Sequence, residues 1–136
     1  MKHKSLKYYK ARADRLFSLY IRQRDADENG YCKCITCKGL GLWSYFDSGH
    51  FMLRQNEGTR YHEKNANVQC KGCNNKNWKQ GLQYEHGKAI DKKFGDGTAD
   101  KLTILSKITC YRSWFDYKIL GDEILEKLKS NNFEIR

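Results

Sequence analysis

Two pairs of cysteines with the spacing C-x-x-C constrain the fold of this chain more than any other feature. The first pair is Cys34 and Cys37, the second is Cys70 and Cys73, and 32 residues lie between them. Four thiolates in two such pairs are typical of a closed, tetrahedral zinc site with a structural role. We therefore expect structural Zn²⁺ to join the two pairs, with room for a β-hairpin between them.

The two remaining cysteines, Cys32 and Cys110, stand outside these pairs. Cys32 is an alternative ligand to Cys34, but four residues separate it from Cys37, so the tighter pair is preferred. Residues 1–30 contain no apolar signal segment, and no stretch is apolar over the length of a membrane span. We expect a cytoplasmic protein without membrane contact, whose thiols are reduced or bound to metal rather than paired in disulfides.

The bulk composition indicates one basic domain. The 136 residues include 26 Lys and Arg against 16 Asp and Glu, a net charge of +10. A hydrophobic fraction of 39% and a mean hydropathy of −0.88 leave a thin core, which a bound metal would help to stabilise. A surface this basic favours nucleic acid as the partner, and the alternative is a well-solvated basic protein.

Hydrophobic periodicity divides this single domain into three parts of an α+β fold. Residues 1–24 read as a basic amphipathic helix, residues 31–82 as a zinc-stapled ββα core, and residues 83–136 as a helical C-terminal part. The basic face of the first helix has two interpretations, a solvated surface or a surface that contacts phosphates. No internal repeat or linker points to a second domain.

Finer expectations follow from the same patterns. A short strand is predicted through residues 43–46, after a glycine-rich turn. Helical spacing resumes after Cys73 and extends to Tyr84 or beyond. In the C-terminal part the spacing predicts one helix over residues 98–118 and a second over residues 119–129.

A histidine lies between the cysteine pairs without belonging to either. It ends the motif Asp47-Ser48-Gly49-His50, and Asn74 directly follows the second pair. In a ββα unit clamped by zinc, His50 falls at the end of the first strand and Asn74 on the first turn of the helix. One histidine, one carboxylate and one asparagine that converge on a cation are what a metal-dependent phosphodiesterase needs.

In these motifs the chain resembles the Rap/NinG recombination endonucleases of lambdoid phages, over roughly residues 15–95. The residues that carry the resemblance are, in order, Phe17 to Arg22, Cys34 to Cys37, Asp47 to Phe51, Arg54, Arg60 and Tyr61, Asn65, and Gln69 to Asn74. That family is similar in turn to the HNH, or ββα-metal, nucleases. The resemblance implies an endonuclease that cleaves branched DNA such as D-loops and Holliday junctions.

The resemblance also implies roles for single residues. His50 corresponds to the general base that takes a proton from the attacking water, and Asn65 to the residue that fixes the loop orienting it. Asp47 and Asn74 correspond to ligands of a catalytic Mg²⁺ or Mn²⁺. Many HNH enzymes place a metal-binding Asp directly before the histidine, whereas this chain has Gly49 there.

Which carboxylate binds the catalytic metal therefore stays open at this point. Asp47 is the preferred ligand, and its alternative role is to cap the turn before His50. Asp25 and Asp27 are the reserve candidates, although they precede the first cysteine pair. His62 is read as a surface residue rather than a ligand.

Basic residues that flank the proposed site are expected to contact the DNA backbone, which contributes affinity without sequence readout. They are Arg54, Arg60, Lys71, Lys76 and Lys79. Tyr61 and Trp78 could stack on unpaired bases, although a role in the core is the commoner one for such aromatics.

These inferences favour a structure-specific DNA endonuclease in the cytoplasm of a phage-infected or lysogenic bacterium. Cleaving both strands of a symmetrical junction needs two active sites, so a homodimer is expected, and a phage recombinase is a possible partner. The alternatives are an HNH nicking or packaging nuclease on duplex DNA and a zinc-binding nucleic-acid adaptor without catalysis.

Overall fold

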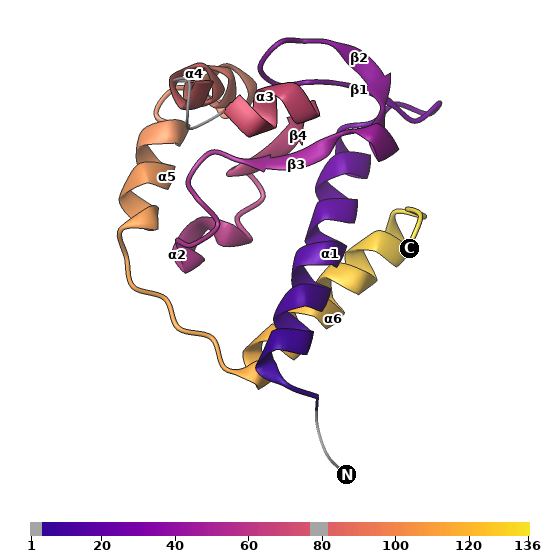
Figure 1. The fold of residues 1–136 in the computed structure, drawn as a ribbon, viewed down its shortest axis with the longest axis vertical. Helices are drawn as coiled ribbons and strands as arrows, with labels where there is room; N and C mark the ends of the chain where they lie inside the picture. Colours follow the sequence, from indigo (N-terminus) through magenta and orange to yellow (C-terminus); the bar gives the residue numbers. More distant parts are fainter. Residues whose placement is uncertain (1–3, 77–81) are drawn as a thin grey trace.

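The computed structural model describes residues 4–76 and 82–136, and it confirms the predicted α+β fold class (Figure 1). Two small hairpins lie between an N-terminal helix and a set of C-terminal helices. In chain order the elements are α1 (Leu6–Arg24), β1 (Tyr31–Lys33), β2 (Leu40–Leu42), the 3₁₀ turn η1 (Trp43–Tyr45), β3 (Asp47–His50), α2 (Glu57–Arg60), β4 (Ala66–Gln69), α3 (Lys71–Lys76), α4 (Leu82–Phe94), α5 (Thr98–Ser106) and α6 (Trp114–Ser130).

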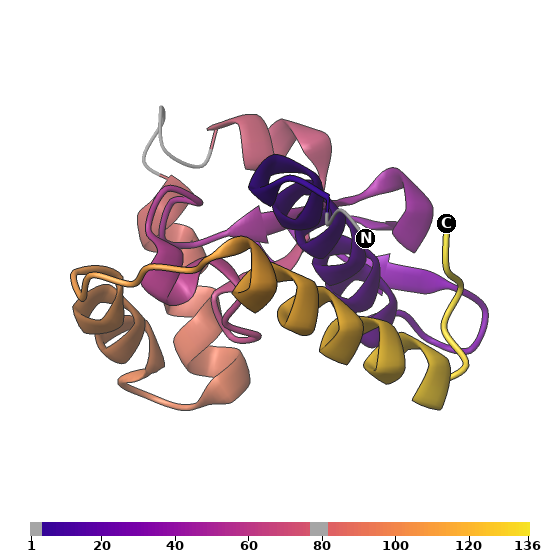
Figure 2. The ribbon, with the colours of Figure 1, turned by 90° about the horizontal axis from the view of Figure 1, so that it is seen from below.

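The first and last helices, α1 and α6, lie side by side in parallel orientation (Figure 2). Both begin at a serine whose hydroxyl accepts a hydrogen bond from a backbone amide of the first turn, Ser5 in α1 and Ser113 in α6. At their far ends, the side chain of Gln23 exchanges hydrogen bonds with the backbone of Glu134. Their apolar stripes pack together in the largest core cluster, which contains Leu16, Phe17, Leu19, Ile21, Ala66, Ile124 and Leu128.

The first hairpin carries Cys32 and the first cysteine pair, and the second carries the D-x-G-H motif and leads into the second pair. β1 pairs with β2, with Cys32 opposite Gly41, and β3 pairs with β4, with His50 opposite Ala66. α3 follows β4 directly, so β3, β4 and α3 form the predicted ββα unit (Figure 1). β4 is buried along its whole length because β3, β1 and α1 pack around it.

The helices α4 and α5 close a second core cluster on the other side of the hairpins. Its members are Ile35, Phe51, Met52, Ile90 and Leu102. After a turn at residues 107 and 108, the chain runs from α5 as an extended segment, residues 109–113, to the start of α6 (Figure 1). Arg112 anchors this segment, because its guanidinium donates to the carbonyl and the carboxylate of Glu57.

Three local predictions were wrong. Residues 43–45 form a 3₁₀ turn, and the strand begins only at Asp47. The helix that carries Asn74 starts at Lys71, before the second cysteine of its pair, which makes Asn74 its fourth residue. The break in the C-terminal helices falls at residues 107–113 instead of between residues 118 and 119, because Arg112 holds that segment extended and the capping box at Ser113 starts a new helix.

Candidate functional site

The four cysteines of the two C-x-x-C pairs come together at one end of the ββα unit. Their sulfur atoms all lie within 4.8 Å of one another, and Cys37 Sγ is 3.9 Å from Cys70 Sγ. A tetrahedral zinc with Zn–S bonds of about 2.3 Å separates its sulfurs by roughly 3.8 Å, so the arrangement fits that ion. Backbone amides of Cys37 and Cys73 donate to the first sulfur of each pair, as expected where thiolates carry negative charge.

Cys32 and Cys110 lie outside this cluster. Cys32 packs with Phe46 and Val68 in an apolar cluster, and its burial raises the pKa of its thiol to about 11. The sulfur of Cys34, unlike that of Cys32, belongs to the four-sulfur cluster. The structure therefore favours Cys34 over Cys32 as the fourth ligand, in agreement with the tighter spacing.

His50 ends β3 and lies half-buried against Phe17 of α1, with the ring centroids 6.2 Å apart. Its Nε2 is 2.9 Å from the carbonyl oxygen of Arg60. A carbonyl can only accept a hydrogen bond, so Nε2 carries the proton and Nδ1 is the basic nitrogen of the neutral ring. Burial lowers the pKa of His50 to about 4, against the opposing effect of this carbonyl, and the ring is therefore neutral at pH 7.

Asn65 fixes the backbone of the segment that follows His50. Its side chain accepts a hydrogen bond from the Met52 amide at 2.8 Å and donates to the Met52 carbonyl at 3.2 Å. Its backbone carbonyl accepts from the Phe51 amide. The side chain is fully buried, so these bonds fix the turn after β3.

Asp47 and Asn74 lie next to each other, where β3 faces α3. The Asn74 amide donates to one carboxylate oxygen of Asp47 at 3.1 Å, and the ammonium of Lys71 contacts the other at 2.7 Å. The Lys71 ammonium is thus a cation that already pairs with this carboxylate. A carboxylate beside an amide is a hard oxygen donor set that suits Mg²⁺ or Mn²⁺.

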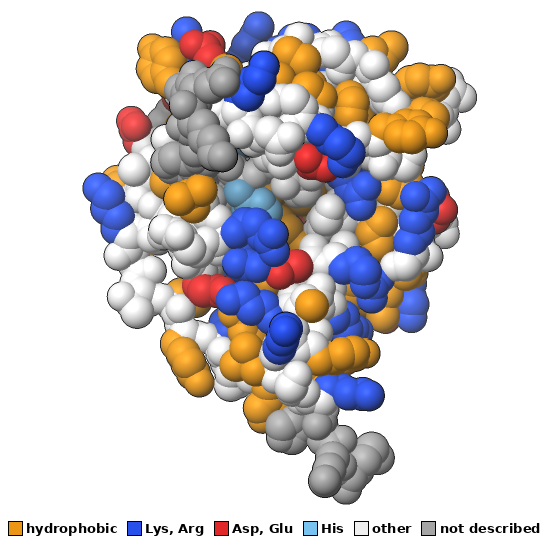
Figure 3. Space-filling view, in the orientation of Figure 1, with side chains coloured by type: hydrophobic (Ala, Val, Ile, Leu, Met, Phe, Trp, Pro, Cys, Tyr) orange, Lys and Arg blue, Asp and Glu red, His pale blue; other side chains and the backbone are white. Residues whose placement is uncertain are grey.

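These three residues, His50, Asp47 and Asn74, line one cavity of about 610 Å³. α1 forms a wall of it with Asp14, Arg15, Phe17, Ser18 and Arg22. Lys and Arg side chains gather on the face of the molecule where β3 and α1 lie (Figure 3). The cavity is therefore a basic hollow with a histidine and a carboxylate in its walls, which suits a phosphodiester.

Arg15 and Arg22 were missed as site residues by the sequence analysis. Arg22 stacks on Trp43 with 5.2 Å between guanidinium and ring centroid, and its Nε donates to the backbone and hydroxyl of Ser18. The signal was the spacing of residues 15, 18 and 22, which places them on one helical face. The sequence left two interpretations for the basic face of this helix, a solvated surface or a surface that contacts phosphates. Because Arg15 and Arg22 line the cavity, this part of the face favours the second interpretation.

The residues predicted to contact DNA do not share one environment. Arg54 and Lys71 line the cavity, whereas Lys76 is exposed at the end of α3. Arg60 differs from expectation: its side chain is only 10% exposed and is held by the carboxylate of Asp14, which argues against a contact with phosphate. Lys79 and Trp78 lie outside the described residues.

The other candidates lie away from the cavity or inside the core. Tyr61 packs edge-to-face on Phe17 and donates its hydroxyl to Asp14, which is the core role. The reserve carboxylates Asp25 and Asp27 line a different cavity, and His62 borders a third. Among the carboxylates considered from the sequence, Asp47 is therefore the one that shares a cavity with His50 and Asn74. Asp14 also lines this cavity, but its carboxylate is held by Arg54, Arg60 and Tyr61.

In the parts of the chain that the structure describes, no helix combines the length and the apolar character that crossing a membrane requires.

Comparison with known proteins gives one family. The family model described as bacteriophage lambda NinG protein matches residues 1–132. No curated protein and no solved structure matches the chain. Because the family model spans nearly the whole sequence, the chain belongs to the bacteriophage lambda NinG family.

Proposed function

We propose that this chain is a metal-dependent endonuclease that cleaves branched DNA, such as D-loops and Holliday junctions. The observation that carries the proposal is the convergence of His50, Asp47 and Asn74 on one basic cavity. A zinc-binding adaptor without catalysis needs the cysteines and a positive surface. It has no need of a neutral, oriented histidine beside a carboxylate.

His50 is suited to accept a proton from water. The Arg60 carbonyl at Nε2 orients the ring and leaves Nδ1 as its basic nitrogen. Because the pKa of His50 is held near 4, nearly every molecule has the neutral ring at pH 7, although each ring is then a weaker base. The water that loses its proton to Nδ1 attacks the phosphorus atom in line with the departing 3′ oxygen.

Asp47 and Asn74 are the residues that would hold the catalytic Mg²⁺ or Mn²⁺. Bound there, the ion would supply a Lewis acid that stabilises negative charge on the phosphate and on the leaving oxygen. Lys71 now neutralises Asp47 and would give up this contact to the metal. Arg22, held in place by Trp43 and Ser18, is oriented to bind the phosphate of the strand to be cut.

The experiment that tests the proposal compares a labelled four-way junction with a linear duplex of the same sequence. Wild type, His50→Ala and His62→Ala are incubated with each substrate, with and without Mg²⁺, and the zinc content of every protein is measured. His62 is the matched control because it is a second half-buried histidine that does not line the cavity.

We expect Mg²⁺-dependent cutting of the junction that falls at least about 100-fold in His50→Ala and is unchanged in His62→Ala. Equal cutting of junction and duplex would instead indicate a general nicking nuclease. Binding without cutting in any divalent metal would refute the enzyme and leave the zinc-binding adaptor. Sedimentation of the protein on the junction would show whether two copies act together, as symmetrical cleavage requires.

A further inference from the structure

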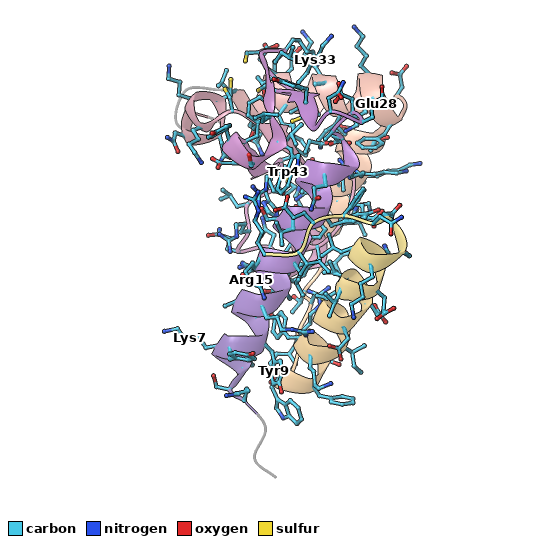
Figure 4. All side chains as sticks on the ribbon, turned by 90° about the vertical axis from the view of Figure 1, so that its right-hand side faces the viewer. Lys7, Tyr9, Arg15, Glu28, Lys33 and Trp43 are labelled. Carbon is cyan, nitrogen blue, oxygen red and sulfur yellow. The ribbon has the colours of Figure 1, made fainter. Side chains whose placement is uncertain are left out.

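A second cavity, of about 580 Å³, shares no lining residue with the candidate active site among the described residues, and Cys34 of the cysteine cluster lies in its wall. It is formed by the turn after α1, the β1 strand, the loop of the first cysteine pair, β4 and α4. Lys33, one of its residues, lies with Glu28 at the end of the molecule opposite Lys7 (Figure 4).

Four lysines from three separate elements border this cavity. Lys33 lies on β1, Lys38 on the loop of the first cysteine pair, and Lys92 and Lys93 on α4. Lys33 and Lys92 are exposed at the rim. Cations that converge from different parts of the chain on one hollow indicate an anionic ligand.

The two carboxylates at the border are already satisfied inside the protein. Asp25 binds both Arg24 and Lys93, and these cations lower its pKa although burial raises it. Asp27 accepts hydrogen bonds from the backbone amides of Asn29 and Tyr31, which fixes the turn before β1. The four lysines at the border still exceed these two acids by two positive charges.

The remaining lining is apolar and partly exposed. Tyr31 is 43% exposed and Leu40 is 65% exposed, although both are large hydrophobic side chains. Cys32, Ile35, Val68 and the cluster cysteine Cys34 form the buried part of the wall. An exposed aromatic ring over an apolar floor, within reach of lysines, is the combination with which proteins bind single-stranded nucleic acid, since bases stack on the ring and phosphates meet the cations.

The two cavities share their supporting elements. Arg22 near the end of α1 lines the first cavity, and Asp25, the residue that caps α1, lines the second. The β3–β4 hairpin likewise contributes Ser48 to the first and Val68, its cross-strand neighbour, to the second. Two strands that separate at a branch point can therefore enter different cavities of the same protein.

We propose that the second cavity binds an unpaired single-stranded DNA arm, while the first cavity binds the strand to be cut. This inference rests on the proposed function, because it assumes that the substrate of the first cavity is branched DNA. It assigns the choice of branched over linear DNA to Lys33, Lys92 and the stacking surface of Tyr31.

The test compares a Y-shaped oligonucleotide carrying one single-stranded arm with a linear duplex of the same length. Affinity is measured by fluorescence anisotropy in buffer without divalent metal, for wild type and for Lys33→Ala/Lys92→Ala. The control Lys107→Ala/Lys129→Ala removes the same charge from exposed sites at the end of α5 and on α6. The variant Tyr31→Ala removes the stacking surface without changing the charge.

We expect the cavity double variant to weaken binding of the Y-shaped DNA about tenfold more than binding of the duplex, and Tyr31→Ala to do the same to a smaller extent. The control should weaken both equally and slightly. If the cavity variant and the control behave alike, the inference is wrong. If wild type cuts no DNA in Mg²⁺ but the cavity variant still loses arm binding, the nuclease proposal fails and the second site stands.

Discussion

Gly49, the residue directly before His50, has no room for a side chain. A Cβ built on its backbone would come within 1.9 Å of Gln69 Oε1 and 2.7 Å of Gln69 Cδ. Gln69 cannot move away easily, because it is fully buried and its amide donates to Thr36 at 2.7 Å. The close packing of β3 against this glutamine therefore leaves room only for a glycine at position 49.

The variant Gly49→Ala should lower the free energy of unfolding by about 2–3 kcal/mol, because the added methyl group forces Gln69 or β3 to shift. It should also reduce DNA cleavage, since the shift moves His50. Urea denaturation measures the first effect. Gly72→Ala is the control: nothing lies within 4 Å of that position in α3, so it should be neutral or slightly stabilising.

His86 is the most unusual polar residue of the core. It lies on α4, fully buried against Phe51, and among the described residues neither of its ring nitrogens has a hydrogen-bond partner. Burial lowers its pKa to about 3, with a smaller contribution from His50. The folded protein thus keeps this ring neutral, whereas the unfolded chain protonates it near pH 6.5.

This difference makes stability depend on pH. The unfolded state binds a proton at His86 between pH 6.5 and about 3 and the folded state does not, so stability falls as the pH is lowered through this interval. The contribution is about 1.4 kcal/mol per pH unit. Urea denaturation from about pH 6 down to 4.5 should show that slope reduced by this amount in His86→Leu, and an unchanged slope would contradict the assignment.

At the scale of elements, the cysteine spacing predicted most of what surrounds the site. Four fixed ligands and 32 intervening residues leave few ways to connect two metal-binding turns, so the hairpin between them and the helix after them could be predicted. The grouping of Cys34, Cys37, Cys70 and Cys73 follows the same logic, and the structure confirms it.

The wall that α1 contributes to the cavity could not be predicted in the same way. The positions of Arg15 and Arg22 depend on how α1 packs across the hairpins, which no local pattern encodes. Arg60 is the opposite case, a residue that the sequence placed in the site and the structure removes from it. Its sequence neighbourhood indicated a surface residue, whereas its ion pair with Asp14 buries it. The extended segment before α6 likewise depends on a contact 55 residues away, between Arg112 and Glu57.

Removal of the metal should separate the two cysteine pairs and loosen both the β1–β2 hairpin and α3, which carries Asn74. We expect the variant Cys37→Ser, or chelation of the wild type, to lower the melting temperature by roughly 10 °C or more. Circular dichroism and zinc analysis measure the effect. Cys110→Ser is the control, because that thiol lies on the segment between α5 and α6 and should leave both melting and zinc content unchanged.

At the scale of the whole molecule, a charge of +10 makes binding to any DNA sensitive to salt. The first cavity offers four candidate phosphate contacts, Arg15, Arg22, Arg54 and Lys71. Each contact adds about 0.9 to the slope of log affinity against log salt concentration, so a linear duplex should give a slope near −4.

Titration of duplex binding between about 50 and 200 mM salt tests this estimate, and Arg54→Ala should reduce the slope by about one. Arg54 suits this test because its side chain is 57% exposed and its ion pair with Asp14 is shared with Arg60. Lys129→Ala on α6 is the control and should leave the slope unchanged. A slope near zero would contradict a role for phosphate contacts.

The parallel pairing of α1 with α6 also determines when the protein can fold. During synthesis α1 leaves the ribosome early, yet Gln23 and the part of its apolar stripe that packs on α6 meet their partners only after Ile124, Leu128 and Glu134 have been added. The nascent chain therefore carries this part of the apolar face of α1 uncovered through nearly its whole translation, and α1 completes its packing last. Ribosomes stalled before α6 should hold chains that bind chaperones and remain open to protease.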